Sequence, residues 1–63
     1  MDLNGKKVCI AGLGKTGRTL LHTALRLGAV CHAADTRLLP DADDLRHRYP
    51  QVNFHFGEMP DDL

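Results

Sequence analysis

The chain has 63 residues, eight basic and eight acidic side chains, and a formal net charge of zero. This balance argues against a dedicated nucleic-acid binder, which shows a basic excess on one face. A domain of this size buries only about 60% of the surface that its unfolded chain exposes, so we expect marginal stability for these residues alone. We find no secretory signal pattern and no apolar run near the roughly 20 residues that span a bilayer, and therefore expect a cytoplasmic protein without membrane contact.

The two cysteines, Cys9 and Cys31, both stand in apolar runs typical of strands. Cysteines in such runs usually act as small buried hydrophobic residues, and we expect this of both. No histidine stands at metal-ligand spacing from a cysteine or another histidine, so the sequence predicts no metal site. The chain contains no serine and no recognisable nucleophile or general base, so it predicts no catalytic residues.

Residues 8–11 form a short apolar run with two β-branched side chains, which predicts a buried strand. Glycines interrupt the pattern over residues 12–17. A helix is then predicted over residues 16–27, because apolar side chains recur there at helical spacing. This stripe is expected to face the core and consists of Leu20, Leu21, Ala24, Leu25 and Leu27.

A second apolar run, residues 29–34, predicts a strand that ends at Asp35. Pro40 breaks the following loop. Residues 41–49 have an acidic first turn and a basic last turn, which suits the dipole of a second helix. Residues 52–56 alternate apolar and polar side chains, as a half-buried or edge strand does. The order β-α-β-α-β predicts an α/β fold with a Rossmann-like parallel sheet that is incomplete, because complete parallel sheets have more strands and cover on both faces.

The segment 12–17, G-L-G-K-T-G, matches the G-x-G-x-x-G pattern between a strand and a helix. Gly12 permits the tight turn, Gly14 lets an anion approach the backbone, and Gly17 lets the helix pack close to the sheet. The start of the helix offers N–H donors and a partial positive charge to a phosphate. Asp35 follows at about the spacing of the acidic residue in the dinucleotide fingerprint. These features together predict a nucleotide-type ligand.

The end of this loop, Gly14-Lys15-Thr16, invites comparison with the Walker-type phosphate loop. That motif needs a glycine five residues before its second glycine, and Cys9 stands there instead. We therefore reject the Walker interpretation, and expect Lys15 to be a surface lysine near the anion.

Asp35 has two possible roles. In NAD-binding folds an acid here accepts hydrogen bonds from the ribose, whereas a carboxylate can also accept an N–H from a base edge. Thr36 and Arg37 would lie beside whatever Asp35 holds. Arg37 could stack on a base, pair with a phosphate, accommodate an NADP 2′-phosphate, or be a solvated loop residue. An NAD(P)-binding segment of an oxidoreductase and a binding module without a ligand therefore stay open as alternatives.

Residues 6–17 and 34–37 together resemble the start of a Mur ligase, and within that family the members that add D-glutamate. The family opens with a short Gly-Lys lead, an apolar strand, a G-L-G-x-[ST]-G loop, a helix that ends near a glycine, and a second strand that ends in D-T-R. Thr16 and the D-T-R of residues 35–37 separate this pattern from that of dehydrogenases. The resemblance spans nearly the whole chain.

The resemblance implies that residues 1–63 are the N-terminal portion of a Rossmann-like domain that binds the UDP moiety of UDP-N-acetylmuramoyl-L-alanine. Lys15 and Thr16 would offer loop amides to the diphosphate, although Lys15 stands where some relatives have an apolar residue. Asp35, Thr36 and Arg37 would surround the uracil. The expected substrate-binding residues are Gly14, Lys15, Thr16, Gly17, Asp35, Thr36 and Arg37.

The resemblance also implies an ATP- and magnesium-dependent ligase of peptidoglycan precursor synthesis, and hence a role in cell wall biogenesis, cell shape and cell division. The ATP-binding and amino-acid-binding domains, with the catalytic residues, would belong to the rest of the same polypeptide. The chain's own residues are therefore expected to bind the UDP-linked muramoyl substrate, without a cofactor and without being an enzyme on their own.

Overall fold

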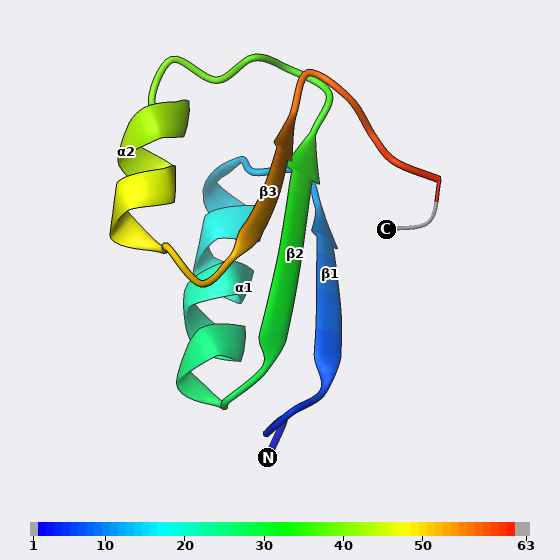
Figure 1. The fold of residues 1–63 in the computed structure, drawn as a ribbon, viewed down its shortest axis with the longest axis vertical. Helices are drawn as coiled ribbons and strands as arrows, with labels where there is room; N and C mark the ends of the chain where they lie inside the picture. Colours follow the sequence, from blue (N-terminus) through cyan, green and yellow to red (C-terminus); the bar gives the residue numbers. More distant parts are fainter. Residues whose placement is uncertain (1, 62–63) are drawn as a thin grey trace.

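The computed structural model describes residues 2–61 and contains three strands and two helices in alternation. The elements are β1 (Lys7–Ala11), α1 (Lys15–Arg26), β2 (Val30–Asp35), α2 (Ala42–Arg48) and β3 (Asn53–Phe56). The strands form one parallel sheet in the order β1-β2-β3 (Figure 1). The predicted incomplete Rossmann-like α/β fold is confirmed. No helix within residues 2–61 is long and apolar enough to cross a membrane.

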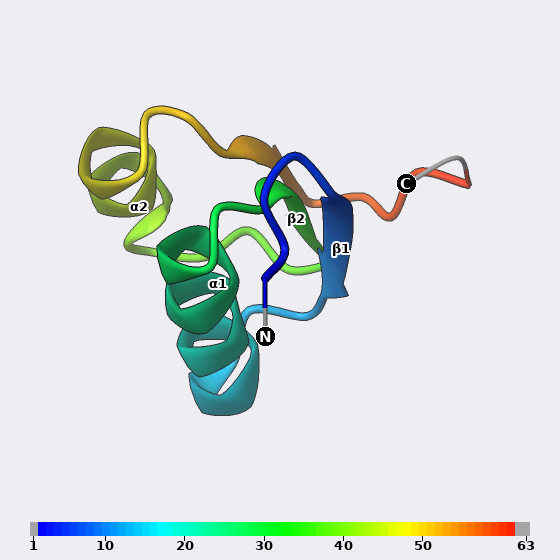
Figure 2. The same ribbon diagram turned by 90° about the horizontal axis from the view of Figure 1, so that it is seen from below.

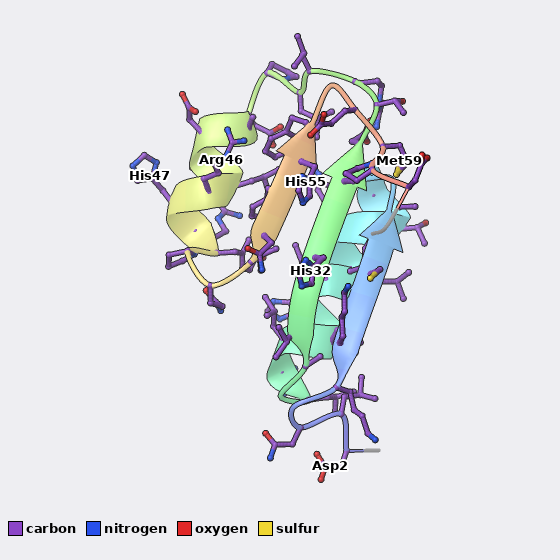
Figure 3. All side chains as sticks on the ribbon, turned by 45° about the vertical axis from the view of Figure 1, so that its right-hand side comes forward. Asp2, His32, Arg46, His47, His55 and Met59 are labelled. Atoms are coloured by element: carbon purple, nitrogen blue, oxygen red, sulfur yellow. The ribbon has the colours of Figure 1, made fainter. Side chains whose placement is uncertain are left out.

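Both helices lie on the same face of the sheet (Figure 2). This follows from the strand order, because two successive crossovers that advance in the same direction place their helices on one side. The opposite face carries the side chains of His32 and His55 (Figure 3). Within residues 2–61 no helix covers that face, so the sheet has one packed side and one open side.

The hydrophobic core lies between α1 and the covered face of the sheet. Its largest fully buried side chains are Leu13, Leu21 and Cys31. Gly17 brings the start of α1 close to the loop, since a Cβ atom there would lie 1.9 Å from the Gly12 carbonyl oxygen. The predicted reason for a glycine at this position, close packing of helix and sheet, is therefore confirmed.

Two expectations about burial are wrong. Helix α1 buries Gly17, Leu21 and Ala24, whereas Leu20 is 56% exposed. Cys31 is buried as expected, but Cys9 is exposed because it projects from the open face of the sheet. The two errors have different causes. Cys9 points to the face of the sheet that no described helix covers, whereas Leu20 points toward β1 and is exposed because, within residues 2–61, no strand lies beyond the outer edge of β1.

Candidate functional site

The glycine loop joins β1 to α1 and leaves the helix N-terminus accessible. Gly12 has a φ of +101°, which favours glycine, and its N–H donates to the Ala34 carbonyl at 2.7 Å. The first helical hydrogen bond runs from the Arg18 N–H to the Gly14 carbonyl at 3.0 Å. The N–H groups of residues 15–17 therefore have no acceptor within the helix. No acidic side chain lies in this first turn, so the helix end is suited to an anion.

Gly14, which begins this helix, is exposed, and a Cβ atom built on it would meet nothing within 4 Å. The bare backbone thus has open space in front of it. Lys15 and Thr16 are exposed next to it, while Gly17 is buried against the Gly12 carbonyl. The exposed part of the loop that a ligand can reach therefore runs from Gly14 to Thr16.

The carboxylate of Asp35 lies at the end of β2 and accepts four hydrogen bonds. Its Oδ2 accepts from the Leu13 N–H and from Arg37 Nη2, each at 2.8 Å. Its Oδ1 accepts from the Arg37 N–H at 2.9 Å and from Arg37 Nε at 3.0 Å. Asp35 is only 3% exposed. The carboxylate thus joins the glycine loop to the turn after β2.

These contacts stabilise the ionised form of Asp35. The hydrogen bonds from the Arg37 side chain, followed by those from the Leu13 and Arg37 amides, hold the pKa of the Asp35 carboxyl well below its usual range. The same pairing raises the pKa of Arg37. The Arg37 side chain is still 64% exposed, and its bonds to Asp35 use Nε and Nη2. Its Nη1 and the flat faces of its guanidinium are left for other partners.

A second ion pair, which the sequence did not reveal, lies beside the first. Arg18 donates from Nε to the Leu13 carbonyl at 2.8 Å and from both Nη atoms to the Asp41 carboxylate, with Nη2 to Oδ1 at 3.1 Å. The hydrogen bond to Asp41 raises the pKa of Arg18, and the bond from Arg18 lowers the pKa of Asp41. Asp41 therefore precedes α2 without capping it by its side chain.

The structure brings the two predicted groups of site residues to the same end of the sheet. The loop group and the group of residues 35–37 meet where Leu13 donates to Asp35. Thr36 and Arg37 are exposed, and the Gly57 N–H closes the turn from the β3 side by donating to the Asp35 carbonyl at 2.9 Å. Of the predicted site residues, Gly17 and Asp35 are buried and the other five are accessible.

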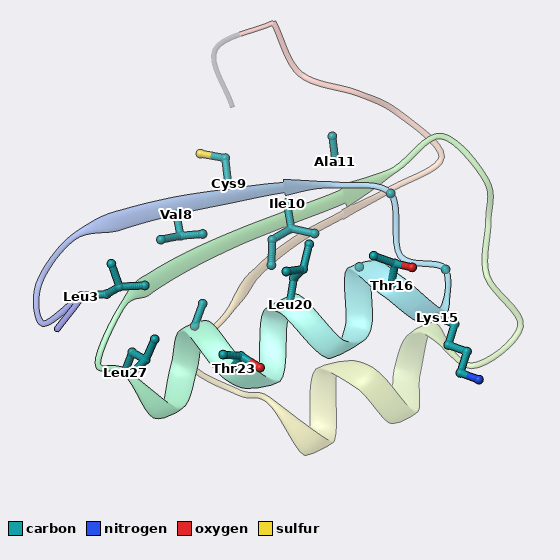
Figure 4. Close-up of a pocket in the computed structure, with 14 residues that line it drawn as sticks. Leu3, Val8, Cys9, Ile10, Ala11, Lys15, Thr16, Leu20, Thr23 and Leu27 are labelled. Carbon is teal, nitrogen blue, oxygen red and sulfur yellow. The ribbon is translucent and has the colours of Figure 1, made fainter. Parts of the chain in front are cut away.

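A cleft of about 680 Å³ runs from the glycine loop along the outer side of β1 (Figure 4). Its floor is apolar: Val8 and Ile10 of β1 point toward α1, and Leu20 of α1 points toward them. Gly14, Lys15 and Thr16 line one end. Residues 35–37 do not line this cleft, so the cleft meets the predicted site only at the loop.

The described residues do not fit an ATP site of the Walker type. Cys9 stands where that motif needs its first glycine, and it lies within β1 on the open face of the sheet. We therefore assign no Walker-type phosphate loop to residues 2–61.

Comparison with known proteins gives a consistent set of relatives. A UDP-N-acetylmuramoylalanine--D-glutamate ligase from Nitrosomonas europaea is 45% identical over 64 residues, which cover 100% of this chain and 14% of the relative. Ligases of the same name from Hydrogenovibrio crunogenus (41% identity, 81% of this chain, 11% of the relative) and Pectobacterium atrosepticum (40%, 98% and 14%) also match. The chain thus spans about a seventh or less of each relative's length. No protein-family model matches the chain, and no solved structure gives a significant match.

Proposed function

Because the chain belongs to the Mur ligase family, as a relative of the N-terminal part of UDP-N-acetylmuramoylalanine--D-glutamate ligases, we propose that it binds the UDP moiety of UDP-N-acetylmuramoyl-L-alanine. In this proposal residues 1–63 are the N-terminal portion of a substrate-binding domain in a cytoplasmic, ATP-dependent ligase of peptidoglycan synthesis. The amino acid that the ligase adds is D-glutamate. The rest of the polypeptide supplies the ATP site and the chemistry.

The observation that carries the proposal is the contact between Leu13 and Asp35. It joins the glycine loop before α1 to the residue before the exposed Thr36–Arg37 turn, at one end of the sheet. Lys15 and Thr16 are exposed, and their amides at the start of α1 suit a diphosphate, because a helix N-terminus favours negative charge. Arg37 offers a flat guanidinium held by Asp35, which suits stacking on a planar base. Such an arrangement accommodates a base at one side and a diphosphate at the other.

The hydrogen bonds that Asp35 accepts weigh against the alternative of NAD(P), and equally against a base N–H that donates to this carboxylate. That alternative needs the carboxylate after the second strand to accept hydrogen bonds from the ribose. A carboxylate has about four acceptor positions, and in Asp35 four internal N–H groups occupy them. A ribose would have to displace one of these bonds.

The test is a titration of the intact protein, followed by the amide signals of residues 13–37 in NMR spectra. We expect UDP-N-acetylmuramoyl-L-alanine and UDP to shift the signals of Lys15, Thr16 and Arg37, whereas NADH leaves them in place. His22, exposed on α1, gives a control signal in the same helix. Shifts with NADH alone would support the oxidoreductase alternative, and indifference to all three ligands would reject nucleotide binding.

A further inference from the structure

The backbone of Leu13 is held on both sides by charged residues. Its N–H donates to Asp35 Oδ2 at 2.8 Å, and its carbonyl accepts from Arg18 Nε at 2.8 Å. The Leu13 side chain is itself fully buried in the core. The centre of the glycine loop is therefore fixed by two charge-assisted hydrogen bonds and by packing.

Each of these charged residues also holds one end of the loop between β2 and α2. Asp35 binds the Arg37 side chain, and Arg18 binds the Asp41 carboxylate through both Nη atoms. The loop 37–41 is thus attached at both ends to a residue that holds Leu13. A shift of the glycine loop would strain both attachments, and a shift of loop 37–41 would strain the Leu13 peptide.

We propose that Arg18 and Asp41 are positioning residues that couple the diphosphate half of the site to the base half. The inference rests on the proposed function, which assigns the diphosphate to the loop at Lys15–Thr16 and the base to Thr36–Arg37. Arg18 and Asp41 keep these halves at the separation that one nucleotide needs, and they touch neither half of the ligand. Two sites that share a rigid connection bind a ligand spanning both more tightly than sites that move independently.

The Arg18–Asp41 ion pair differs from an ordinary exposed ion pair. Arg18 and Asp41 are each under 40% exposed in their side chains, and the pair joins segments 23 residues apart. The planar guanidinium is required, since one group must reach the Leu13 carbonyl and both carboxylate oxygens at once. The Arg48 charge is the smallest of the effects that lower the pKa of Asp41. The ion pair between Arg48 and Asp44 lies within α2, spans one helical turn at 3.3 Å and is more than 60% exposed on both sides. It supplies a matched control.

The experiment compares three ligands on the intact protein by calorimetry: UDP, uridine and inorganic pyrophosphate. In Arg18→Met we expect UDP affinity to fall about tenfold, while uridine and pyrophosphate affinities each change less than about threefold, since each fragment occupies only one half. Asp41→Asn keeps the Arg18–Leu13 bond and should lower UDP affinity by a smaller factor, about threefold. Arg48→Met removes only a weak charge effect on Asp41 and should change all three affinities by less than Asp41→Asn does.

A second measurement tests whether binding at the base half changes the glycine loop. In the wild type, uridine binding should shift the amide signals of Gly14 and Lys15, which it does not contact, and in Arg18→Met this response should disappear. If Arg18→Met fails to fold, both measurements are made on Asp41→Asn.

Two results would overturn the coupling. One is a loss of UDP affinity matched by an equal loss for one fragment, which would mean direct contact or local collapse. The other is unchanged UDP affinity in both variants. Failure of wild-type protein to bind UDP would instead reject the proposed function, and the coupling with it.

Discussion

Helices α1 and α2 both cross from one strand to the next on the same face of the sheet, yet they are attached to it by different kinds of contact. Helix α1 contributes buried apolar residues to the core, with Leu21 fully buried. Among the described residues, none of the core cluster lies in α2. Helix α2 buries Leu45 and is otherwise attached by charge: Asp41 just before it binds Arg18, and the Arg46 guanidinium lies 4.7 Å from the centre of the Phe56 ring.

The difference shows how the proposed site is built. The glycine loop belongs to the first crossover, β1-α1-β2, whose helix contributes to the core cluster. The Thr36–Arg37 turn belongs to the second crossover, β2-α2-β3, which ion pairs hold together with the buried Leu45 and Val52. Apolar contacts are not screened by ions and contain no titrating group, whereas ion pairs weaken with added salt and with acid. We therefore expect the base half of the site to be the more easily perturbed half.

The largest effect should come from adding one methyl group to the first crossover, which runs from β1 through α1 to β2. In Gly17→Ala the new Cβ would lie 1.9 Å from the Gly12 carbonyl oxygen, so α1 must move off the loop. We expect the free energy of unfolding to fall by more than about 3 kcal/mol. Hydrogen exchange of the β2 amides in the intact protein measures this local stability. Gly14→Ala is the control, with an expected cost below about 1 kcal/mol, because its Cβ meets open space.

Truncating a buried leucine in each helix would sharpen the comparison. Leu21→Ala should cost about 3 kcal/mol, because a fully buried side chain leaves a cavity in the core. Leu45→Ala should cost less, about 2 kcal/mol, since Leu45 lies outside the core cluster. Leu20→Ala, at a position that is 56% exposed, should cost less than about 1 kcal/mol. Equal costs for Leu21 and Leu45 would contradict the difference between the two helices.

Acid should loosen the second crossover before the first. Asp35 and Asp41 both have folded-state pKa values below the unfolded value of about 3.9, so their contribution is present above that pH and is lost as pH falls through the folded values. We expect exchange protection of the α2 and Arg37 amides to stay constant from about pH 7 to 5 and to fall below about pH 4. In Asp41→Asn the exchange protection of the α2 amides should fall less steeply with decreasing pH. An unchanged profile would assign the acid sensitivity to other carboxylates.

The smallest effect is expected from the exposed ion pair of α2. Arg48 and Asp44 are each more than 60% exposed, and such pairs contribute less than about 1 kcal/mol. Arg48→Met should therefore change the exchange protection of α2 by less than about 0.5 kcal/mol. The double substitution with Asp44→Asn should add nothing further. A larger change would mean that charge holds α2 more generally than the Arg18–Asp41 contact suggests.

Local patterns in the sequence predicted most of the fold. The glycine spacing, the two apolar runs and the charge order of residues 41–49 indicated the five elements, because each depends on neighbours within a turn or a strand. The exposure of Leu20 and Cys9 was not predictable in this way, since it depends on what covers the outer edge of β1 and the open face of the sheet. The Arg18–Asp41 pair was missed because it joins residues 23 apart through the shape of a loop. The placement of Asp35 beside the glycine loop was predictable, since the fingerprint spacing depends on it.

The outer edge of β1 has a consequence for solubility. The inner edge of β1 pairs with β2, and within residues 2–61 no strand pairs with its outer edge. This outer edge borders the cleft that Leu20 lines. An uncovered strand edge beside apolar surface is a template for cross-chain pairing and aggregation. Lys6 and Lys7 are exposed where this strand begins. When the β1 edges of two copies align in parallel, these lysines bring like charges together, so neutralising them should lower the concentration at which the protein precipitates.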